Sequence, residues 1–355
     1  MKGPRLVTAE QVAAGGFDTV IDARSPSEFA EDRLPGAVNW PVLDDAQRRE
    51  VGTIYVQQSP LLARQIGAAL VARNIADHLD AHIRGKPADW KPLVYCWRGG
   101  QRSGSLAWFL SQVGYRTSQL EGGYKAFRAL VRAQLETLPA PLTFVVLAGR
   151  TGSGKTRLLQ RLAADGAQVL DLEDLACHRG SVLGGLPGRP QPTQKAFDTA
   201  VWRALRGFDP ARPVFVESES ARIGRLRVPE ALLLALRERG RTVRIEMPVA
   251  ARVALLLEDY AFFAADPEGF GRLLQPLVEL QGRERVSGWQ ALALQGRWAE
   301  LFERLMAEHY DPLYERSMKR HYETLATAPV VDLPDGGPAA LAAAARALQE
   351  RFTGA

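Results

Sequence analysis

Residues 96–102 bring a thiol, two glycines and two arginines into one short segment, Cys-Trp-Arg-Gly-Gly-Gln-Arg. An apolar run of strand type precedes the segment, and apolar residues at helical spacing follow Ser103, a good helix N-cap. A tight loop between a strand and a helix turns its backbone N–H groups inward, where they and the two guanidinium groups would stabilise a thiolate or an anion attached to it. A buried, inert cysteine is rare in such a loop, so we expect Cys96, Arg98 and Arg102 to be catalytic.

Two kinds of chemistry use a loop of this composition. In sulfur-family transfer, Cys96 would carry a persulfide or perselenide, and the loop would hold its negative charge. In phosphate-ester cleavage, Cys96 would attack phosphorus and Arg102 would bind the phosphoryl oxygens, because the two residues also match the pattern C-x5-R, followed by Ser103. The loop alone does not distinguish these chemistries.

A second motif, Gly-Arg-Thr-Gly-Ser-Gly-Lys-Thr, occupies residues 149–156 and matches the P-loop pattern G-x-x-x-x-G-K-[ST]. It follows a buried-strand pattern at residues 142–148 and precedes an amphipathic helix, which is the context that the motif requires. The glycines allow backbone N–H groups to approach phosphate oxygens, the lysine reaches the outer phosphates, and the threonine hydroxyl can hold Mg²⁺. We therefore expect a diphosphate or triphosphate to bind at Gly149, Gly152, Ser153, Gly154, Lys155 and Thr156.

Further polar residues follow the later strand patterns. Asp171 and Glu217 each end a strand-like run, and either could lie beside Mg²⁺. We expect no tightly bound cofactor and assign no metal site; if Mg²⁺ binds, Thr156 and Asp171 are the expected ligands. Loops at the carboxyl ends of strands surround the phosphates in such a fold, so polar loop residues there are candidates for ligand or RNA contacts. These candidates are His178, Arg179, Glu217 and Arg222.

The order of strand and helix patterns predicts an α/β protein with two domains. Residues 1–135 form the first α/β domain, and residues 136–141, which include two prolines, read as a linker. Residues 142–355 form a P-loop NTPase-like α/β domain that contains a mainly helical insertion at about residues 249–325. The apolar stripes of this insertion indicate helix packing rather than a ligand-binding sequence.

Composition indicates the compartment and the kinds of partner to expect for this chain. Cys96 and Cys177 are its two cysteines, which excludes a disulfide framework and a zinc-ligand cluster and favours the reducing cytoplasm. No apolar run is long enough to span a bilayer, and the N-terminus lacks a signal-peptide pattern, so we expect a cytoplasmic protein without a membrane partner. The formal net charge of +5 permits a polyanionic partner such as RNA without requiring one.

Several short motifs of the first domain resemble those of the rhodanese domain. The matching segments are Asp22-Ala-Arg-Ser25 with Glu28-Phe29, Leu34-Pro-Gly-Ala37 with Asn39 and Pro41, the Cys96 loop, and Gly122-Gly-Tyr124. This resemblance implies a rhodanese-like fold and favours sulfur-family transfer. Tyr95 stands where phosphatases with a C-x5-R loop usually have histidine, although one phosphatase group shares the rhodanese fold.

A rhodanese-like domain joined to a P-loop domain is a rare pairing, and the whole chain resembles the tRNA 2-selenouridine synthase family. The motifs behind this resemblance are the Cys96 loop, His178-Arg-Gly-Ser181, Glu217-Ser-Glu-Ser220 and His309-Tyr-Asp-Pro312. The resemblance implies a transferase that replaces the sulfur of wobble 2-thiouridine in tRNA with selenium through an S-geranyl intermediate. Its implied partners are tRNA, geranyl diphosphate and selenophosphate.

Other functions remain open on the sequence. The P-loop's usual ligand is a nucleotide, so an ATP-dependent kinase or ATPase with a rhodanese-type sulfurtransferase or C-x5-R phosphatase module is the alternative enzyme. A non-enzymatic sulfur carrier is a third interpretation. The sequence leaves open the tRNA isoacceptors, the order of binding, the oligomeric state and the role of Cys177.

Overall fold

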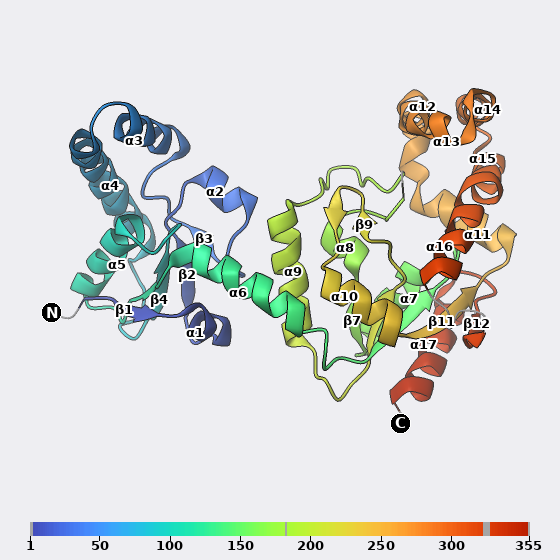
Figure 1. The fold of residues 1–355 in the computed structure, drawn as a ribbon, viewed down its shortest axis with the longest axis horizontal. Helices are drawn as coiled ribbons and strands as arrows, with labels where there is room; N and C mark the ends of the chain where they lie inside the picture. Colours follow the sequence, from blue (N-terminus) through green and yellow to red (C-terminus); the bar gives the residue numbers. More distant parts are fainter. Residues whose placement is uncertain (1–2, 182, 322–326, 354–355) are drawn as a thin grey trace. The chain divides into compact units, whose positions relative to one another are not determined.

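The computed structural model describes residues 3–181, 183–321 and 327–353, which fold into two compact units (Figure 1). The first unit comprises Met1–Gln134 and Pro192–Arg203, and the second comprises Leu135–Gln191 and Ala204–Ala355. Each unit is an α/β structure built on its own parallel sheet, as the strand and helix patterns predict.

The first unit is built on a five-stranded parallel sheet in the order β1-β5-β4-β2-β3. Its strands are β1 (Arg5–Val7), β2 (Thr19–Asp22), β3 (Val38–Asn39), β4 (Pro92–Tyr95) and β5 (Ser118–Leu120). Its helices are α1 (Ala9–Ala14), α2 (Pro26–Glu31), α3 (Asp45–Gln57), α4 (Pro60–His82), α5 (Gln101–Val113) and α6 (Gly123–Thr137). Strand β4 lies in the middle of the sheet and is buried along its whole length, as expected of a strand covered on both faces.

Residues 192–203 belong to the first unit although the sequence boundaries place them in the second domain. They form the first turns of α9 (Gln194–Gly207), and their contacts in this unit are specific. The Trp202 ring packs edge-on against Phe127 at a centroid distance of 5.4 Å. The Thr199 hydroxyl donates to the buried Asp32 carboxylate at 3.0 Å. Such aromatic packing and a satisfied buried carboxylate explain why this segment groups with the first sheet.

The second unit is also built on a five-stranded parallel sheet, in the order β12-β11-β6-β8-β7. Its strands are β6 (Phe144–Ala148), β7 (Gln168–Leu170), β8 (Val214–Glu217), β11 (Arg241–Glu246) and β12 (Val330–Asp332), with a separate hairpin of β9 (Arg222–Ile223) and β10 (Leu226–Arg227). Besides the end of α9, its sheet is accompanied by α7 (Lys155–Ala164), α8 (Leu172–Ala176), α10 (Glu230–Leu234), a π-helical segment Ala235–Arg239 and α17 (Pro338–Thr353). Because β6 is the central strand, the loop that follows it lies at the middle of the sheet's carboxyl edge.

The chain between β11 and β12 is helical through most of its described length, which agrees with the predicted insertion. It contains α11 (Val249–Asp259), α12 (Pro267–Leu274), α13 (Val278–Gln281), α14 (Arg283–Leu294), α15 (Trp298–Leu305) and α16 (Asp311–His321), with 3₁₀ turns at Ala261–Ala265 and Gln275–Leu277 and a π-helical segment at Met306–Tyr310. Trp289, Phe270 and Phe302 are central members of its own hydrophobic core. Residues 322–326, at the end of the predicted insertion, lie outside the described residues.

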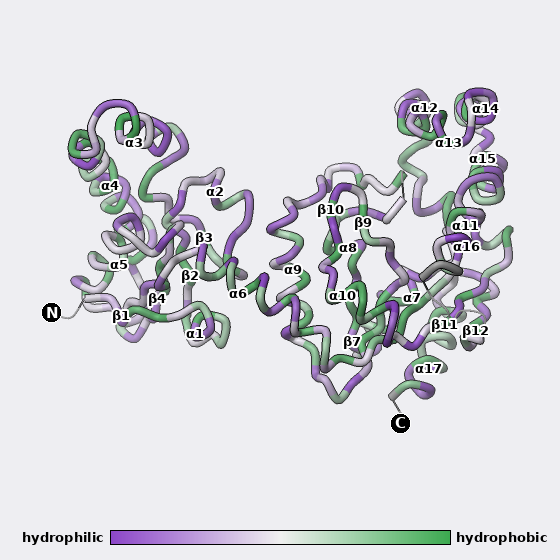
Figure 2. Tube along the Cα trace, in the orientation of Figure 1, coloured by the Kyte–Doolittle hydropathy of each residue, from purple (hydrophilic) through white to green (hydrophobic). Residues whose placement is uncertain are grey.

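Figure 2 shows hydrophilic and hydrophobic residues mixed along α4, α12 and α14. Among the described residues, no helix combines the length and the apolarity needed to cross a membrane.

Candidate functional sites

Cys96 lies directly after β4, at the carboxyl edge of the first sheet, and is only 3% exposed. The Ser103 hydroxyl, in the first turn of α5, donates to the Cys96 Sγ atom at 3.1 Å. Gln119 of β5 in turn donates to the Ser103 hydroxyl at 3.2 Å and to the Gly99 carbonyl at 2.6 Å. The thiol and its loop are therefore held in place by hydrogen bonds from the next helix and the next strand.

The loop shape depends on two glycines. Gly99 has a φ of +67°, and a Cβ atom there would lie 2.6 Å from the Leu120 carbonyl oxygen. Gly123 has a φ of +59°, and its Cβ would lie 2.3 Å from the Cys96 carbonyl oxygen. Within the described residues, the backbone N–H groups of residues 97–100 have no hydrogen-bond acceptor. These N–H groups are available to an anion at the loop, as the sequence predicts.

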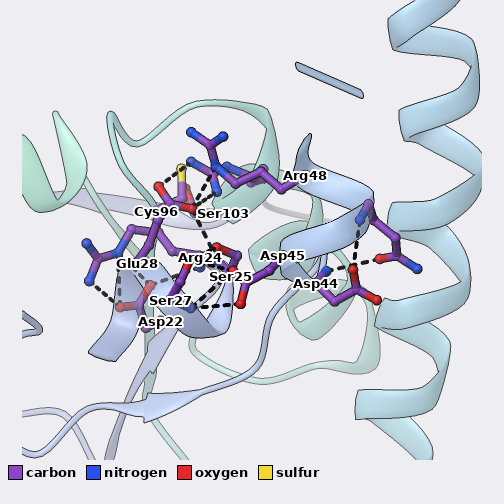
Figure 3. Close-up of polar contacts among 12 residues, drawn as sticks. Asp22, Arg24, Ser25, Ser27, Glu28, Asp44, Asp45, Arg48, Cys96 and Ser103 are labelled. Carbon is purple, nitrogen blue, oxygen red and sulfur yellow. Dashed lines mark hydrogen bonds and ion pairs between the residues drawn. The ribbon is translucent and has the colours of Figure 1, made fainter. Parts of the chain in front are cut away.

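The Arg102 guanidinium forms an ion pair with the carboxylate of Glu28, which is labelled in Figure 3. Its Nη1 atom lies 2.7 Å from Glu28 Oε2, and Arg48 Nε lies 3.0 Å from the same oxygen. Burial raises the pKa of Glu28, but hydrogen bonding and charge from Arg102 and Arg48 outweigh it and hold that pKa below its usual value. Arg98 is exposed in the same loop. The sequence motif predicts Arg98 and Arg102 as site residues, but it does not predict that Glu28 binds Arg102.

A buried ion pair supports the neighbouring strand end. Asp22 and Arg24 are both fully buried, with Arg24 Nη2 at 2.6 Å from Asp22 Oδ2. Arg24 also donates to the Asp32 carbonyl at 2.7 Å, and its Cζ atom lies 4.0 Å from the centre of the Tyr124 ring. These contacts join the segments around the Cys96 loop, and none of them requires a substrate.

The second candidate site is the P-loop, residues 149–154, between β6 and α7. Lys155 Nζ donates to the Gly149 carbonyl at 2.6 Å and to the Arg150 carbonyl at 3.2 Å. Thr156 Oγ1 lies 3.4 Å from Glu173 Oε2. Ser153 is 1% exposed, and among the described residues its hydroxyl has no hydrogen-bond partner. An unsatisfied hydroxyl inside such a loop is suited to a ligand phosphate.

Three carboxylates gather beside the P-loop. Glu217 ends β8, the strand next to β6, while Glu173 lies in α8 and Glu219 follows β8; their carboxylate oxygens lie within 4.8 Å of one another. Burial and then the charge of Glu219 raise the pKa of Glu173 to about 8. Burial and then the charge of Glu217 raise the pKa of Glu219 to about 8. Burial and then the charge of Glu173 also raise the pKa of Glu217 well above its usual value. Such crowding favours either protonation or a bound cation.

The donor set fits Mg²⁺, which prefers hard oxygen ligands. Glu173, Glu217 and Glu219, together with the Thr156 hydroxyl, would hold the ion. Asp171, the expected carboxylate ligand, lies at the start of α8 and accepts the Asp174 N–H at 2.8 Å, which is a helix-capping contact. The structure thus places Glu173, two residues later, beside Thr156.

A cavity of about 680 Å³ opens over the P-loop within the second unit. It brings together most of the residues that the sequence named for this domain: Gly149, Gly152, Ser153, Gly154, Lys155, Thr156, Asp171, His178, Arg179 and Glu217. Arg222 lies on β9 and is not part of the lining. The lining also includes residues that share one face of the α16 region, at spacings of three and four: His309, Tyr310, Leu313, Tyr314, Ser317 and Met318. The cavity therefore combines charged groups with aromatic and apolar side chains.

The comparisons with known proteins agree with both units. A rhodanese-like domain model matches residues 7–130, and the model of the tRNA 2-selenouridine synthase AAA domain matches residues 142–267. A tRNA 2-selenouridine synthase of Nitrosomonas europaea is 34% identical over 73% of this chain and 68% of its own. One of Nitrosomonas eutropha is 33% identical over 86% of this chain and 80% of its own. The chain belongs to the tRNA 2-selenouridine synthase family. The predicted resemblance and fold class are both confirmed.

In this member of the synthase family, sequence reasoning missed the ion pair that fixes the cavity wall. Arg252 of α11 is 2% exposed; its Nε donates to the Thr151 carbonyl at 2.8 Å, and its two Nη atoms bind the Asp311 carboxylate at 2.9 and 2.6 Å. The pair thus connects the P-loop to the first turn of α16. The signal was present in the sequence: Arg252 lies on the same helix face as Leu255 and Leu256, where a charged residue needs a buried partner.

Proposed function

We propose that the chain replaces the sulfur of wobble 2-thiouridine in tRNA with selenium through an S-geranyl intermediate, using geranyl diphosphate and selenophosphate. Membership of the synthase family supports tRNA as the substrate and selenouridine as the product. The two candidate sites have the different chemistries that two successive transfers need. The cavity over the P-loop supports the proposal, since its lining combines a diphosphate-binding loop with the apolar side chains of Leu255, Leu256, Leu313 and Met318.

In the geranyl step, the thiocarbonyl sulfur attacks C1 of the geranyl chain, the C1–O bond breaks, and diphosphate leaves while the base loses its N3 proton to water. The P-loop N–H groups, Lys155 and the Ser153 hydroxyl would stabilise the charge that develops on the leaving diphosphate. Mg²⁺, held by the three glutamates and Thr156, would add positive charge beside the same oxygens when it is bound. The apolar side chains of the lining would bury the hydrocarbon chain.

In the selenium step, the selenium of selenophosphate attacks C2 of the base, the C2–Se bond forms, the C2–S bond breaks and the geranyl thiolate leaves; water then cleaves the P–Se bond and releases phosphate. Selenophosphate is an anion, so the loop's N–H groups, Arg98 and Arg102 would bind it beside Cys96. The hydrogen bond from Ser103 would hold the Cys96 sulfur in one orientation during this step. We expect this chemistry in the cytoplasm, on a tRNA bound through its phosphates.

The three glutamates beside the P-loop equally suit a Mg²⁺-nucleotide, so an ATP-dependent kinase or ATPase with a sulfurtransferase module is the second candidate. The decisive experiment incubates the purified chain with tRNA that contains 2-thiouridine and analyses the digested nucleosides by mass spectrometry. Geranyl diphosphate alone should give the S-geranyl nucleoside, and further addition of selenophosphate should give 2-selenouridine. Nucleotide hydrolysis without any geranylated product would refute the proposal.

A further inference from the structure

The motif His309-Tyr-Asp-Pro312 contains a buried histidine to which neither transfer step assigns a role. His309 is 2% exposed, yet it belongs to the lining of the cavity over the P-loop. It lies in the π-helical segment Met306–Tyr310, a local widening of a helix that is often found at functional sites. An imidazole beside a cavity can meet a ligand as a donor or as an acceptor, so the position of its proton decides what it does.

Two hydrogen bonds fix the position of that proton. Arg285 Nη1 donates to the Gln281 side chain at 2.7 Å, and because a guanidinium can only donate, the atom that it meets is the amide oxygen. The other amide atom of Gln281 is therefore the nitrogen, which can only donate, and it lies 3.0 Å from His309 Nδ1. Nδ1 accepts this bond and so carries no proton. His309 is thus a neutral imidazole with its proton on Nε2.

The surroundings of the ring favour the same neutral form. Burial lowers the pKa of His309, which disfavours the imidazolium ion. The Trp289 and Tyr310 rings meet the imidazole edge-on, at centroid distances of 6.3 and 4.7 Å. Within the described residues, Nε2 has no hydrogen-bond partner. Of the bonded pair Gln281 and His309, only His309 belongs to the cavity lining, so its Nε2–H is the group that a ligand there can meet.

The residues that follow His309 are joined to the P-loop. Tyr310 lines a small pocket together with Thr151 of the P-loop. Asp311 accepts from Arg252 at 2.6 Å, and Arg252 also donates to the Thr151 carbonyl at 2.8 Å. His309 therefore lies in the part of the cavity that adjoins the phosphate-binding loop, where the acceptors of a bound ligand are phosphate oxygens.

We infer that His309 donates a hydrogen bond from its neutral Nε2–H group to a phosphate oxygen of the ligand that the P-loop holds. The inference deepens the proposed function and rests on it for the identity of that ligand, geranyl diphosphate. Nε2 keeps its proton throughout, because losing it would leave a buried imidazolate anion, and Nδ1 has no proton to pass on. The hydrogen bond therefore stabilises the charge that develops on the leaving diphosphate, and His309 does not act as an acid or a base.

Long-range nitrogen–proton NMR spectra of the histidine-labelled chain test the position of the proton. The chain contains five histidines, and His309→Phe assigns the signal of His309 by its absence. Near neutral pH the signal should be that of a neutral ring with a protonated Nε2 and an unprotonated Nδ1. In Gln281→Leu the contact that fixes the proton is lost, so both neutral tautomers should appear. An imidazolium ion, or a proton on Nδ1, in the wild-type chain overturns the inference.

Isothermal titration with geranyl diphosphate, in the absence of tRNA, tests the acceptor. Loss of a hydrogen bond to a charged group should weaken binding to His309→Phe by about 10- to 100-fold. His309→Gln, whose amide nitrogen can replace the Nε2–H donor, should stay within about threefold of wild type. His82→Phe is the matched control: His82 is an exposed residue of α4 whose ring stacks on Trp40 at 4.8 Å, as phenylalanine can, and its loss should leave binding unchanged.

The outcomes separate the inference from the function on which it rests. If His309→Phe binds geranyl diphosphate as tightly as wild type while its KM for tRNA rises, the acceptor lies on the nucleic acid, and the inference is overturned while the proposed function stands. Equal weakening in His309→Phe and His309→Gln also overturns it, because lost packing would then explain the change. If His309→Phe does not fold, as judged by circular dichroism, the smaller His309→Leu takes its place with the same expectation. Wild-type binding that depends on His309, without any geranyl transfer to tRNA, overturns the proposed function alone.

Discussion

Replacing Asp311 by alanine should lower the free energy of unfolding more than replacing its buried partner Arg252. Asp311→Ala leaves a guanidinium that is 2% exposed without its carboxylate, and an uncompensated buried charge costs about 3–5 kcal/mol of unfolding free energy. Arg252→Ala leaves a carboxylate that is 19% exposed and can be hydrated, so the loss is mainly that of charge-assisted hydrogen bonds, about 1.5–3 kcal/mol. We therefore expect the aspartate variant to be the less stable one.

Urea unfolding followed by circular dichroism measures both values without the screening that a salt denaturant would add. The double variant should cost less than the sum of the single ones by at least about 1 kcal/mol, since the residues act as one bridge. Arg272→Ala is the control: Arg272 and Asp266 are 70% and 66% exposed, so their loss should change stability by less than about 0.5 kcal/mol. A smaller cost for Asp311→Ala than for Arg252→Ala, or additive single costs, would refute the reasoning.

Three further predictions concern the two candidate sites. Cys96→Ala should abolish 2-selenouridine formation and spare geranylation, because alkylation of a sulfur already on tRNA needs no protein thiol. Mass spectrometry of digested tRNA measures both products, and selenouridine at the wild-type rate would exclude a role for Cys96 in the selenium step. Lys155→Ala should slow geranyl transfer by about 10²–10³-fold, because a charged donor to the leaving diphosphate is lost. Selenation of pre-geranylated tRNA should change less. Equal losses in both steps would contradict the assignment of Lys155 to the leaving diphosphate. Because burial raises the pKa of Glu173 and Glu219 from 4.5 to about 8, their protonated forms favour the folded state, and the melting temperature in EDTA should fall as the pH rises from 4.5 through 8. Mg²⁺ should offset the fall most strongly near pH 8, and Glu219→Gln should flatten the profile; a melting temperature that rises over this interval in EDTA would refute the cluster's role.

The parts of the two sites that the sequence predicts are those encoded in consecutive residues. The Cys96 loop and the P-loop each lie within one strand-loop-helix unit, so local pattern and turn chemistry define them. The acidic cluster is different, because Glu173 and Glu219 come from the segments after two separate strands and meet only when β7 and β8 pair. The partner of Arg252 lies 59 residues away in sequence and becomes evident only once the insertion has folded.

The grouping of residues 192–203 with the first sheet illustrates the same limit. The sequence of this segment predicts the start of an amphipathic helix, but it does not predict which of the two sheets that helix packs against. Its assignment depends on Trp202 and Thr199 meeting Phe127 and Asp32, contacts that join distant parts of the chain.

The ion pair of Arg102 with Glu28 has a consequence for how long the Cys96 loop keeps its cargo. An anion that binds both terminal nitrogens of Arg102 competes with Glu28 for them, so the affinity that it experiences is a difference between two similar attractions. Arg48 remains on the displaced carboxylate, which makes the exchange inexpensive in either direction. When the anion is passed on, Glu28 recaptures the guanidinium and so favours departure. The loop is thereby suited to handing over a charged group rather than to storing it.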